Sequence, residues 1–277
     1  SKSMIQNTLT CLQGAMNYAI LPLKYIQANP CVAVKIGKMP MDMTAKAHTE
    51  YICSAEEFNQ ILKRFPADNC FHLSLVVPYN TGTRIGETFA IDLSQDVDFE
   101  KHELRIHGQM QKVEKTWYIK PPKYDSYRTI KMGETLEKEL KFAIQQRRIN
   151  KLKYGGAYSK TYLLPDRSIA QIRADIDVPY KEILPLCVKE NGALLTPDSF
   201  KYCARIIHYE LNNPLFHAHC LRHTHGTILA ENGVNPKTVM ERLGHKDITT
   251  TLQTYTFNTD AMQQTAVDVF ENAIQTQ

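Results

Sequence analysis

The sequence predicts a mainly helical α+β protein in which one small antiparallel sheet interrupts a series of helices. Apolar residues recur at three- and four-residue steps along most of the 277-residue chain, which is the period of amphipathic helices. Between residues 92 and 132, short runs rich in β-forming residues alternate with turns, as in strands. The chain is 43% hydrophobic and 22% charged, as is typical of ordinary globular proteins.

The N-terminal stretch is predicted to be the end of a helical domain followed by a linker. Its apolar periodicity from Leu9 to Ile20 indicates a helix that stops near Pro22, and a second short element closes at Asn29-Pro30. Residues 35–46 have the composition of an extended basic linker. Because one or two helices bury little surface alone, we expect residues 1–44 to be the C-terminal end of a truncated domain.

A second domain is predicted over residues 45–277. The capping-box pattern at Ser54–Glu57 marks a fresh helix start. An apolar run at Cys70–Val77 is typical of a buried helix, and Thr81-Gly82-Thr83 breaks it before another helix through Ile85 and Ile91.

Three short strands are predicted next, around turns, and together they indicate the antiparallel sheet. They are Glu103–His107, Trp117–Ile119 and Arg128–Ile130. A long charged helix, Glu134–Lys153, follows and ends at Gly155-Gly156. Residues 157–192 contain three prolines that interrupt a weak helical period, so we expect irregular structure or an insertion there.

The final third is predicted to be helical again. Thr196-Pro197 is a favourable helix entry, with proline as the first helical residue. Asn-Gly and Gly-His turns separate the later helices, which are His219–Glu231, Pro236–Leu243 and Asp247–Tyr255. The chain finishes in an amphipathic tail whose apolar stripe is Ala266, Val269, Phe270, Ala273 and Ile274.

Several classes of protein are excluded by composition. No apolar run approaches the ~20 residues of a membrane span, and the N-terminus lacks the pattern of a signal peptide, so we expect a cytoplasmic protein. The seven cysteines are scattered without a C-x-x-C spacing, which argues for reduced thiols rather than disulfides or structural zinc.

The formal charge of +4 is too small to identify a partner, but its distribution is uneven. Basic residues fall in two stretches, the first comprising Lys112, Lys115, Lys120, Lys123, Arg128 and Lys131, and the second Arg147, Arg148, Lys151 and Lys153. This pattern fits a phosphate-binding face, and equally a solvated charged surface.

Three separated motifs carry the functional signal. They are TGTRIGE at Thr81–Glu87, HCLRH at His219–His223, and LGH at Leu243–His245, with Tyr255 ten residues beyond. In this order and spacing they resemble the tyrosine recombinase family, especially integrases of phages and conjugative elements. The resemblance implies that family's catalytic-domain fold, preceded by the end of a helical core DNA-binding domain.

The two arginines in these motifs suit phosphodiester chemistry. Attack on phosphorus builds negative charge on the non-bridging oxygens, and a guanidinium offers a rigid fork of donors that matches two of them. Arg84 follows a Thr-Gly turn at a helix start, and Arg222 lies three residues after His219 on one helix face. Each arginine alone would more often form a surface ion pair, in the case of Arg84 with Glu87 on the same helix; the combined pattern reverses this and favours a shared phosphate.

The resemblance assigns the nucleophile to Tyr255, one of 14 tyrosines. A phenol has a pKa of about 10, and surrounding cations ease its ionisation. The resemblance also implies that His219 and His245 bind the phosphate or assist proton transfer. Attack by tyrosine conserves bond energy in a phosphotyrosine ester, so strands can be rejoined without ATP, metal or another cofactor.

Other residues complete the expected site. Lys123 resembles the family's catalytic lysine in a flexible hairpin and is the candidate general acid. Its neighbours Lys120 and Lys131 are rivals for that role, and we expect them and Arg128 to contact DNA phosphates. Glu87 matches an acidic position that supports the arginines.

A histidine cluster and a departure from the family pattern also need explanation. His219, His223 and His225 invite interpretation as a metal site, but no cysteine or carboxylate completes a plausible ligand set, so we expect no metal. Many members of the family carry a histidine two residues after the nucleophile, where this chain has Phe257. That substitution puts a secondary contact in doubt, not the nucleophile.

The predicted function is therefore site-specific recombination of double-stranded DNA, through a 3′-phosphotyrosine and a Holliday junction, for integration or excision of a mobile element. The resemblance implies a homotetramer on DNA, assembled through the amphipathic tail, and leaves room for excision or accessory proteins. The apolar stripe of the tail is equally consistent with packing within its own subunit. The alternatives are a type IB topoisomerase or telomere resolvase with the same chemistry, or a non-catalytic DNA-binding relative.

Overall fold

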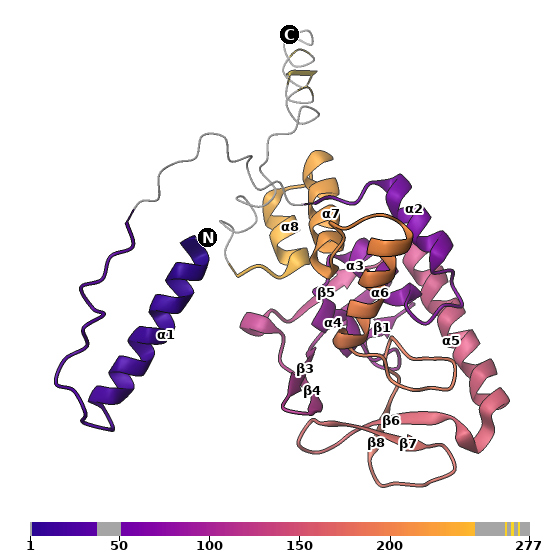
Figure 1. The fold of residues 1–277 in the computed structure, drawn as a ribbon. Helices are drawn as coiled ribbons and strands as arrows, with labels where there is room; N and C mark the ends of the chain where they lie inside the picture. The colour runs from indigo at the N-terminus through magenta and orange to yellow at the C-terminus, as the bar shows by residue number, and fades with distance from the viewer. Residues whose placement is uncertain (1, 38–50, 247–263, 265–266, 269–270, 272–277) are drawn as a thin grey trace. The chain divides into compact units, whose positions relative to one another are not determined.

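The computed structural model describes residues 2–37, 51–246, 264, 267, 268 and 271. It divides into two compact units, residues 1–49 and 50–277 (Figure 1). In the first unit, α1 spans Lys2–Ile20, which confirms the predicted helix, and the chain then folds back along it. Asn29 Nδ2 donates hydrogen bonds to Gln13 O (3.2 Å) and Asn17 Oδ1 (2.7 Å). Most of the predicted linker lies outside the described residues.

The second unit opens with the predicted capping box, which α2 (Ala55–Arg64) uses to begin. The Glu57 backbone N–H donates to Ser54 Oγ (3.1 Å), and the Ser54 N–H donates to the Glu57 carboxylate (2.8 Å). These two bonds satisfy amide groups that the first helical turn leaves without partners. The sequence prediction is confirmed at this helix start.

Helix α3 (His72–Thr81) lies in the core of this unit. It packs against α4 (Ile85–Ala90), α5 (Glu134–Tyr154) and α7 (Ala218–Glu231). Gly82 ends it in the left-handed conformation, with φ of 68°. A Cβ at Gly82 would overlap the Leu243 side chain, so glycine is required there for both backbone conformation and close packing. The predicted break between α3 and α4 is confirmed.

Two small antiparallel sheets follow where one was predicted. Strands β1 (Val97–Asp98), β2 (Glu103–Ile106) and β5 (Arg128–Lys131) form the first sheet. Strands β3 (Gln109–Val113) and β4 (Thr116–Lys120) form a separate hairpin. All three predicted strands are confirmed, but the second of them pairs outside the sheet that joins the other two.

Residues 157–192 are more ordered than the sequence predicted. A one-turn 3-10 helix, η2 (Gly155–Ala157), leads into β6 (Ser159–Leu163), β7 (Ile169–Arg173) and β8 (Lys181–Ile183), which form an antiparallel sheet in the order β7-β6-β8. The expectation of irregular structure was therefore wrong for these three strands, whereas the alternative of an insertion stays a prediction. Proline interrupts helices but is tolerated between strands. The three prolines therefore argued against a helix here and said nothing against strands.

The C-terminal third of the second unit contains α6 (Pro197–Glu210), α7 and α8 (Pro236–Leu243). Figure 1 shows α7 and α8 side by side, and their contacts agree. The predicted helix over residues 247–255 and the tail stripe of Ala266, Val269, Phe270, Ala273 and Ile274 lie outside the described residues. Gln264, Val267, Asp268 and Glu271 are helical.

The fold class is confirmed as mainly helical α+β with small antiparallel sheets. Within the described ranges, no helix has an apolar stretch long enough to cross a membrane. The core of the second unit is built from α2 to α7, the first sheet and the hairpin of β3 and β4. These elements place the turn before α4, the start of β5 and the end of α8 next to one another.

Candidate active site

Arg84 and Glu87 form the first part of the site, at the start of α4. Arg84 directly precedes the helix, and its Nη1 donates to Glu87 Oε1 (2.8 Å). The backbone N–H of Arg84 donates to the other carboxylate oxygen (2.9 Å). The Glu87 side chain is fully buried, whereas the Arg84 side chain is 19% exposed. The buried Glu87 carboxylate therefore fixes the position of the partly exposed Arg84 guanidinium.

Arg128, at the start of β5, shares this anchor. Its Nη2 donates to Glu87 Oε2 (2.8 Å), and its Nη1 approaches Glu87 Oε1 at 3.3 Å. Burial alone would raise the pKa of Glu87, but hydrogen bonding and the charges of Arg128 and Arg84 outweigh it and lower that pKa. Glu87 is therefore a buried carboxylate between two guanidinium groups.

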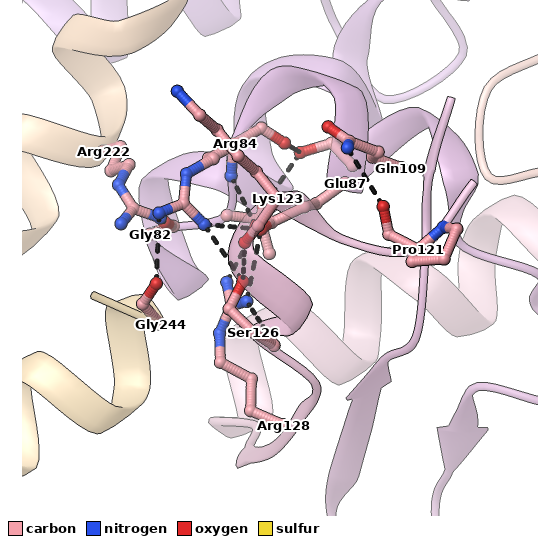
Figure 2. A network of polar contacts seen from close by, with 12 residues as sticks. Gly82, Arg84, Glu87, Gln109, Pro121, Lys123, Ser126, Arg128, Arg222 and Gly244 are labelled. Carbon is pink, nitrogen blue, oxygen red and sulfur yellow. Dashed lines mark hydrogen bonds and ion pairs between the residues drawn. The ribbon is translucent and has the colours of Figure 1, made fainter. Parts of the chain in front are cut away.

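Both arginines also reach the carboxyl end of α8 (Figure 2). Arg84 Nη2 donates to the carbonyl oxygen of Gly244 (3.1 Å), and Arg128 Nε donates to that of Arg242 (2.8 Å). Carbonyl groups at a helix end have no partner within the helix, and cations are favourable there. The end of α8 is thus tied to the turn that carries Arg84.

Arg222 enters from α7 and is almost completely buried, with 1% of its surface exposed. Its Nη1 donates to the carbonyl oxygen of Gly82 (2.7 Å), in the same turn that carries Arg84. Figure 2 shows Arg222 and Arg84 beside this turn. The two predicted phosphate-binding arginines therefore converge on one turn from distant parts of the chain.

His219 and His245 lie close to this cationic group. The His219 side chain is exposed and that of His245 is half-buried. Partial desolvation, followed by the charges of Arg222 and Arg84, lowers the pKa of each histidine to about 4. His219 also contributes to the lowered pKa of His245. Both imidazoles are neutral at pH 7 and can accept or donate a proton.

The other two histidines of α7 have different surroundings. The ring of His223 packs edge-on against His219, with centroids 4.6 Å apart. His225 turns away: its Nδ1–H donates to Tyr79 O (2.9 Å), and its Nε2 accepts from Arg242 Nε (3.0 Å). Over the part of the chain that the structure describes, no group of three or more His, Cys, Asp or Glu residues is arranged to hold a metal ion.

Lys123 stands on a tight loop between β4 and β5. The loop contains a 3-10 turn, η1 (Lys123–Asp125), in which Tyr124 and Asp125 have φ values of 63° and 52°. Left-handed conformations are costly for such residues and cluster at functional sites. Ser126 Oγ donates to Lys123 O (2.9 Å) and lies 3.4 Å from Arg84 Nη1, which places the lysine backbone beside the site.

The predicted DNA-contacting residues have different environments. Lys120 Nζ lies 5.8 Å from the Tyr118 ring centroid, and Lys131 Nζ donates to Lys101 O and pairs with Glu103 (both 2.9 Å). The Arg128 side chain is only 7% exposed. Their contacts with DNA stay predictions, and the interior bonds of Arg128 point to another role.

Two of the four residues in the second basic stretch have acidic partners, and Arg147 bonds to the backbone. Arg147 Nη2 donates to the carbonyl oxygen of Pro185 (2.5 Å). Lys151 and Lys153 form ion pairs with Glu182 (3.9 Å) and Glu190 (2.5 Å). Of the two interpretations of this charge, these pairs favour an ion-paired surface over a phosphate-binding face for residues 147–153.

The structure thus brings together Arg84, Glu87, Arg222, His219 and His245, with Lys123 on the adjoining loop. Tyr255 lies outside the described residues. Sequence reasoning missed Ser126 and Arg242, and missed the interior bonds of Arg128. No local pattern identifies them, because their partners are carbonyl groups and side chains from distant elements.

This arrangement is suited to binding and activating a phosphodiester. Two guanidinium groups can neutralise the charge that develops on phosphate oxygens during attack. Two neutral imidazoles beside them can accept a proton from a nucleophile or donate a hydrogen bond to the phosphate. A cavity of about 680 Å³ lies between the loop at Tyr124–Lys131 and the end of α8, and of these four groups His245 lines it.

Comparison with known proteins gives a consistent family. The phage integrase family model matches residues 53–262, which is most of the chain. A XerC-like tyrosine recombinase of Caldanaerobacter subterraneus subsp. tengcongensis is 27% identical over 94% of this chain and 64% of its own length. The probable integrase of prophage ps2 from Lactococcus lactis is 24% identical over 97% of this chain and 66% of its own. The chain therefore spans just under two thirds of these relatives.

Solved structures agree on the fold. The integrase of transposon Tn1549, in complex with a circular intermediate DNA, superposes with a TM-score of 0.68 at 22% identity. The match covers 96% of this chain and 79% of that one. The XerA recombinase has a TM-score of 0.52 at 20% identity, and the match covers 83% of this chain and 69% of that one.

Proposed function

Because the chain belongs to the phage integrase family of tyrosine recombinases, we propose that it cuts and rejoins DNA at specific sites through a covalent 3′-phosphotyrosine intermediate on Tyr255. The biological outcome would be integration or excision of a mobile element. Relatives of this chain include a probable prophage integrase and the transposase from transposon Tn916, which supports that outcome.

One observation carries the proposal. Arg84 and Arg222 come from positions 138 residues apart in the sequence, yet one turn holds both: Arg84 stands in it, and Arg222 donates to its Gly82 carbonyl. Two guanidinium groups repel each other, so structural ion pairing does not explain why they converge beside neutral histidines. A bound phosphate, carrying the opposite charge, would compensate for that repulsion.

The proposed reaction begins when the Tyr255 phenol oxygen attacks phosphorus. The phenol proton passes to His219 or His245, and Arg84 and Arg222 neutralise the charge on the non-bridging oxygens. The bond between phosphorus and the 5′ oxygen breaks, and Lys123 donates a proton to that oxygen as it leaves. Attack by the 5′ hydroxyl of another strand reverses these steps and joins new partners.

Exchange of two strand pairs requires several protomers on one DNA assembly. We propose a homotetramer that passes through a Holliday junction. The amphipathic tail is the proposed contact between protomers, since its stripe from Ala266 to Ile274 has the spacing of a helix that docks into a groove. Solved relatives in complex with DNA support double-stranded DNA as the partner.

Covalent capture from a randomised DNA pool tests the proposal and selects the target sequence in the same experiment. Nicked duplexes with a randomised central sequence are incubated with the protein, and DNA that remains attached after denaturation is amplified over several rounds. The expected result is an enriched sequence that forms an adduct with the wild-type chain and none with Tyr255→Phe.

Four outcomes would contradict the proposal. An adduct that persists in Tyr255→Phe would remove this tyrosine from the reaction. Site-specific binding without any adduct would favour a non-catalytic DNA-binding relative. Relaxation of supercoiled DNA without sequence preference, or hairpin-ended products, would instead indicate a topoisomerase or a telomere resolvase.

A further inference from the structure

Arg128 is more than a basic residue near the site. Four of its five N–H groups donate to protein acceptors: Nε to Arg242 O (2.8 Å), Nη1 to Glu87 Oε1 (3.3 Å) and Ser126 O (3.2 Å), and Nη2 to Glu87 Oε2 (2.8 Å). With its side chain 7% exposed, the guanidinium is directed into the protein. A residue that contacts DNA through a phosphate presents its donors at the surface instead.

The acceptor at the end of α8 is the informative one. The last carbonyl groups of a helix need outside partners, and here the partners are Arg128 for Arg242 O and Arg84 for Gly244 O. Both guanidinium groups are held by the same buried carboxylate, Glu87. The end of α8 is therefore fixed relative to Arg84 through one shared anchor.

Close packing reinforces this connection. A Cβ on Gly244 would come within 2.8 Å of Arg128 Nη1, so the guanidinium lies directly against the backbone at the helix end. At the same helix end, the Arg242 side chain donates to His225 Nε2 (3.0 Å), Lys131 O (3.1 Å) and Asn80 O (3.1 Å). The end of α8 is thus held by two arginine side chains besides that of Arg84.

Resting on the proposed function, we propose that Arg128 is a positioning residue that holds the end of α8, and with it His245, in register with Arg84. His245 follows Gly244 directly, and Tyr255 is ten residues further along. Arg128 neither touches the DNA nor takes part in proton transfer. It joins the Glu87 carboxylate to the helix end, which requires donors in three directions from one planar group.

This role predicts a particular behaviour for Arg128→Lys and Arg128→Met. An ammonium keeps the charge but cannot bridge Glu87 and the Arg242 carbonyl at once. We therefore expect both variants to form the covalent adduct about 10²-fold more slowly at saturating DNA, as for a reacting group displaced by about 1 Å. Their affinity for the enriched duplex should match the wild type, and so should the dependence of affinity on salt.

A phosphate contact predicts the opposite pattern. Arg128→Met would bind more weakly, with a salt slope smaller by about 0.9, and Arg128→Lys would retain most of the binding and cleavage. That result would overturn the proposal. Adduct formation by the wild-type chain is required before the variants are compared, so a failure of the proposed function is recognised separately.

Labelling of the wild-type chain provides a test that does not depend on variant folding. Phenylglyoxal modifies accessible arginines, and peptide mass analysis locates the labelled residues. We expect Arg128 to resist labelling both with and without DNA, while the exposed Arg105 and Arg148 react. Labelling of Arg128 in the free protein, followed by protection on adding DNA, would contradict the positioning role.

Discussion

Arg84 and Gly244 are joined by a hydrogen bond of 3.1 Å between Nη2 and the carbonyl oxygen, although 160 residues separate them in the sequence. The bond connects the turn before α4 to the residue that ends α8. It brings two of the three sequence motifs into direct contact. Arg222, from the remaining motif HCLRH, donates to the carbonyl oxygen of Gly82 in the same turn at 2.7 Å. The motifs therefore form one site through backbone carbonyls as well as side chains.

Replacing Glu87 with glutamine should destabilise the fold strongly. Two guanidinium groups would lose their buried counter-charge, and breaking a buried ion pair in this way costs about 3–5 kcal/mol. Urea unfolding measures the change in the free energy of unfolding. The matched control is Glu103→Gln, which removes a more exposed pair with Lys131 and should cost at most about 1 kcal/mol. Equal effects of the two substitutions would contradict the anchoring role of Glu87.

Substitution of Gly244 by alanine should cost more than substitution of Gly233. Both glycines have φ near 70°, so both variants carry the same left-handed strain of about 1–2 kcal/mol. Only the Cβ at position 244 meets Arg128, since nothing lies within 4 Å of a Cβ at position 233. Thermal unfolding and adduct formation should both show the larger loss for Gly244→Ala. If the two variants behave alike, the close approach of Arg128 has no energetic consequence.

Stability should fall as pH is lowered from about 6.5 towards 4. Burial is the main cause that lowers the pKa of His223 to about 3 and that of His225 to about 4. An unfolded histidine has a pKa of about 6.5, so in this range the unfolded chain binds more protons and the free energy of unfolding decreases. Above about pH 6.5 this contribution to stability is fully present.

Urea titrations across this pH range measure the effect. His225→Gln should make the decline shallower, because one titrating group is removed, whereas His217→Gln serves as an exposed control. A decline that is unchanged in His225→Gln would mean that this histidine is not held neutral in the folded chain.

Lys123→Met should slow strand cleavage by about 10²–10⁴-fold if Lys123 is the general acid. Sulfur in place of the 5′ bridging oxygen should remove most of this defect, because a thiolate leaves without being protonated. Adduct formation on the two substrates measures the difference. Lys120→Met and Lys131→Met, which replace the rival lysines, should change DNA affinity and its salt dependence instead. Rescue of either control by sulfur would transfer the acid role to that lysine.

The sequence by itself determined the local features of this protein. The capping box at Ser54 and Glu57, the left-handed turn at Gly82 and the limits of α8 follow from interactions within a few residues. The three motifs also named Arg84, Arg222, His219 and His245, all of which the structure brings together. Such features are readable because each depends on neighbours in the chain.

Only the tertiary structure decided how distant segments combine. It paired the strands β6 to β8 where proline had suggested irregular structure, and it separated the hairpin of β3 and β4 from the first sheet. It turned Arg128 inward to Glu87 and Arg242, although its place among basic residues had suggested a surface contact. The reason is physical: pairing between strands and hydrogen bonds to remote carbonyl groups depend on the packing of the whole domain, which leaves no short-range pattern in the sequence.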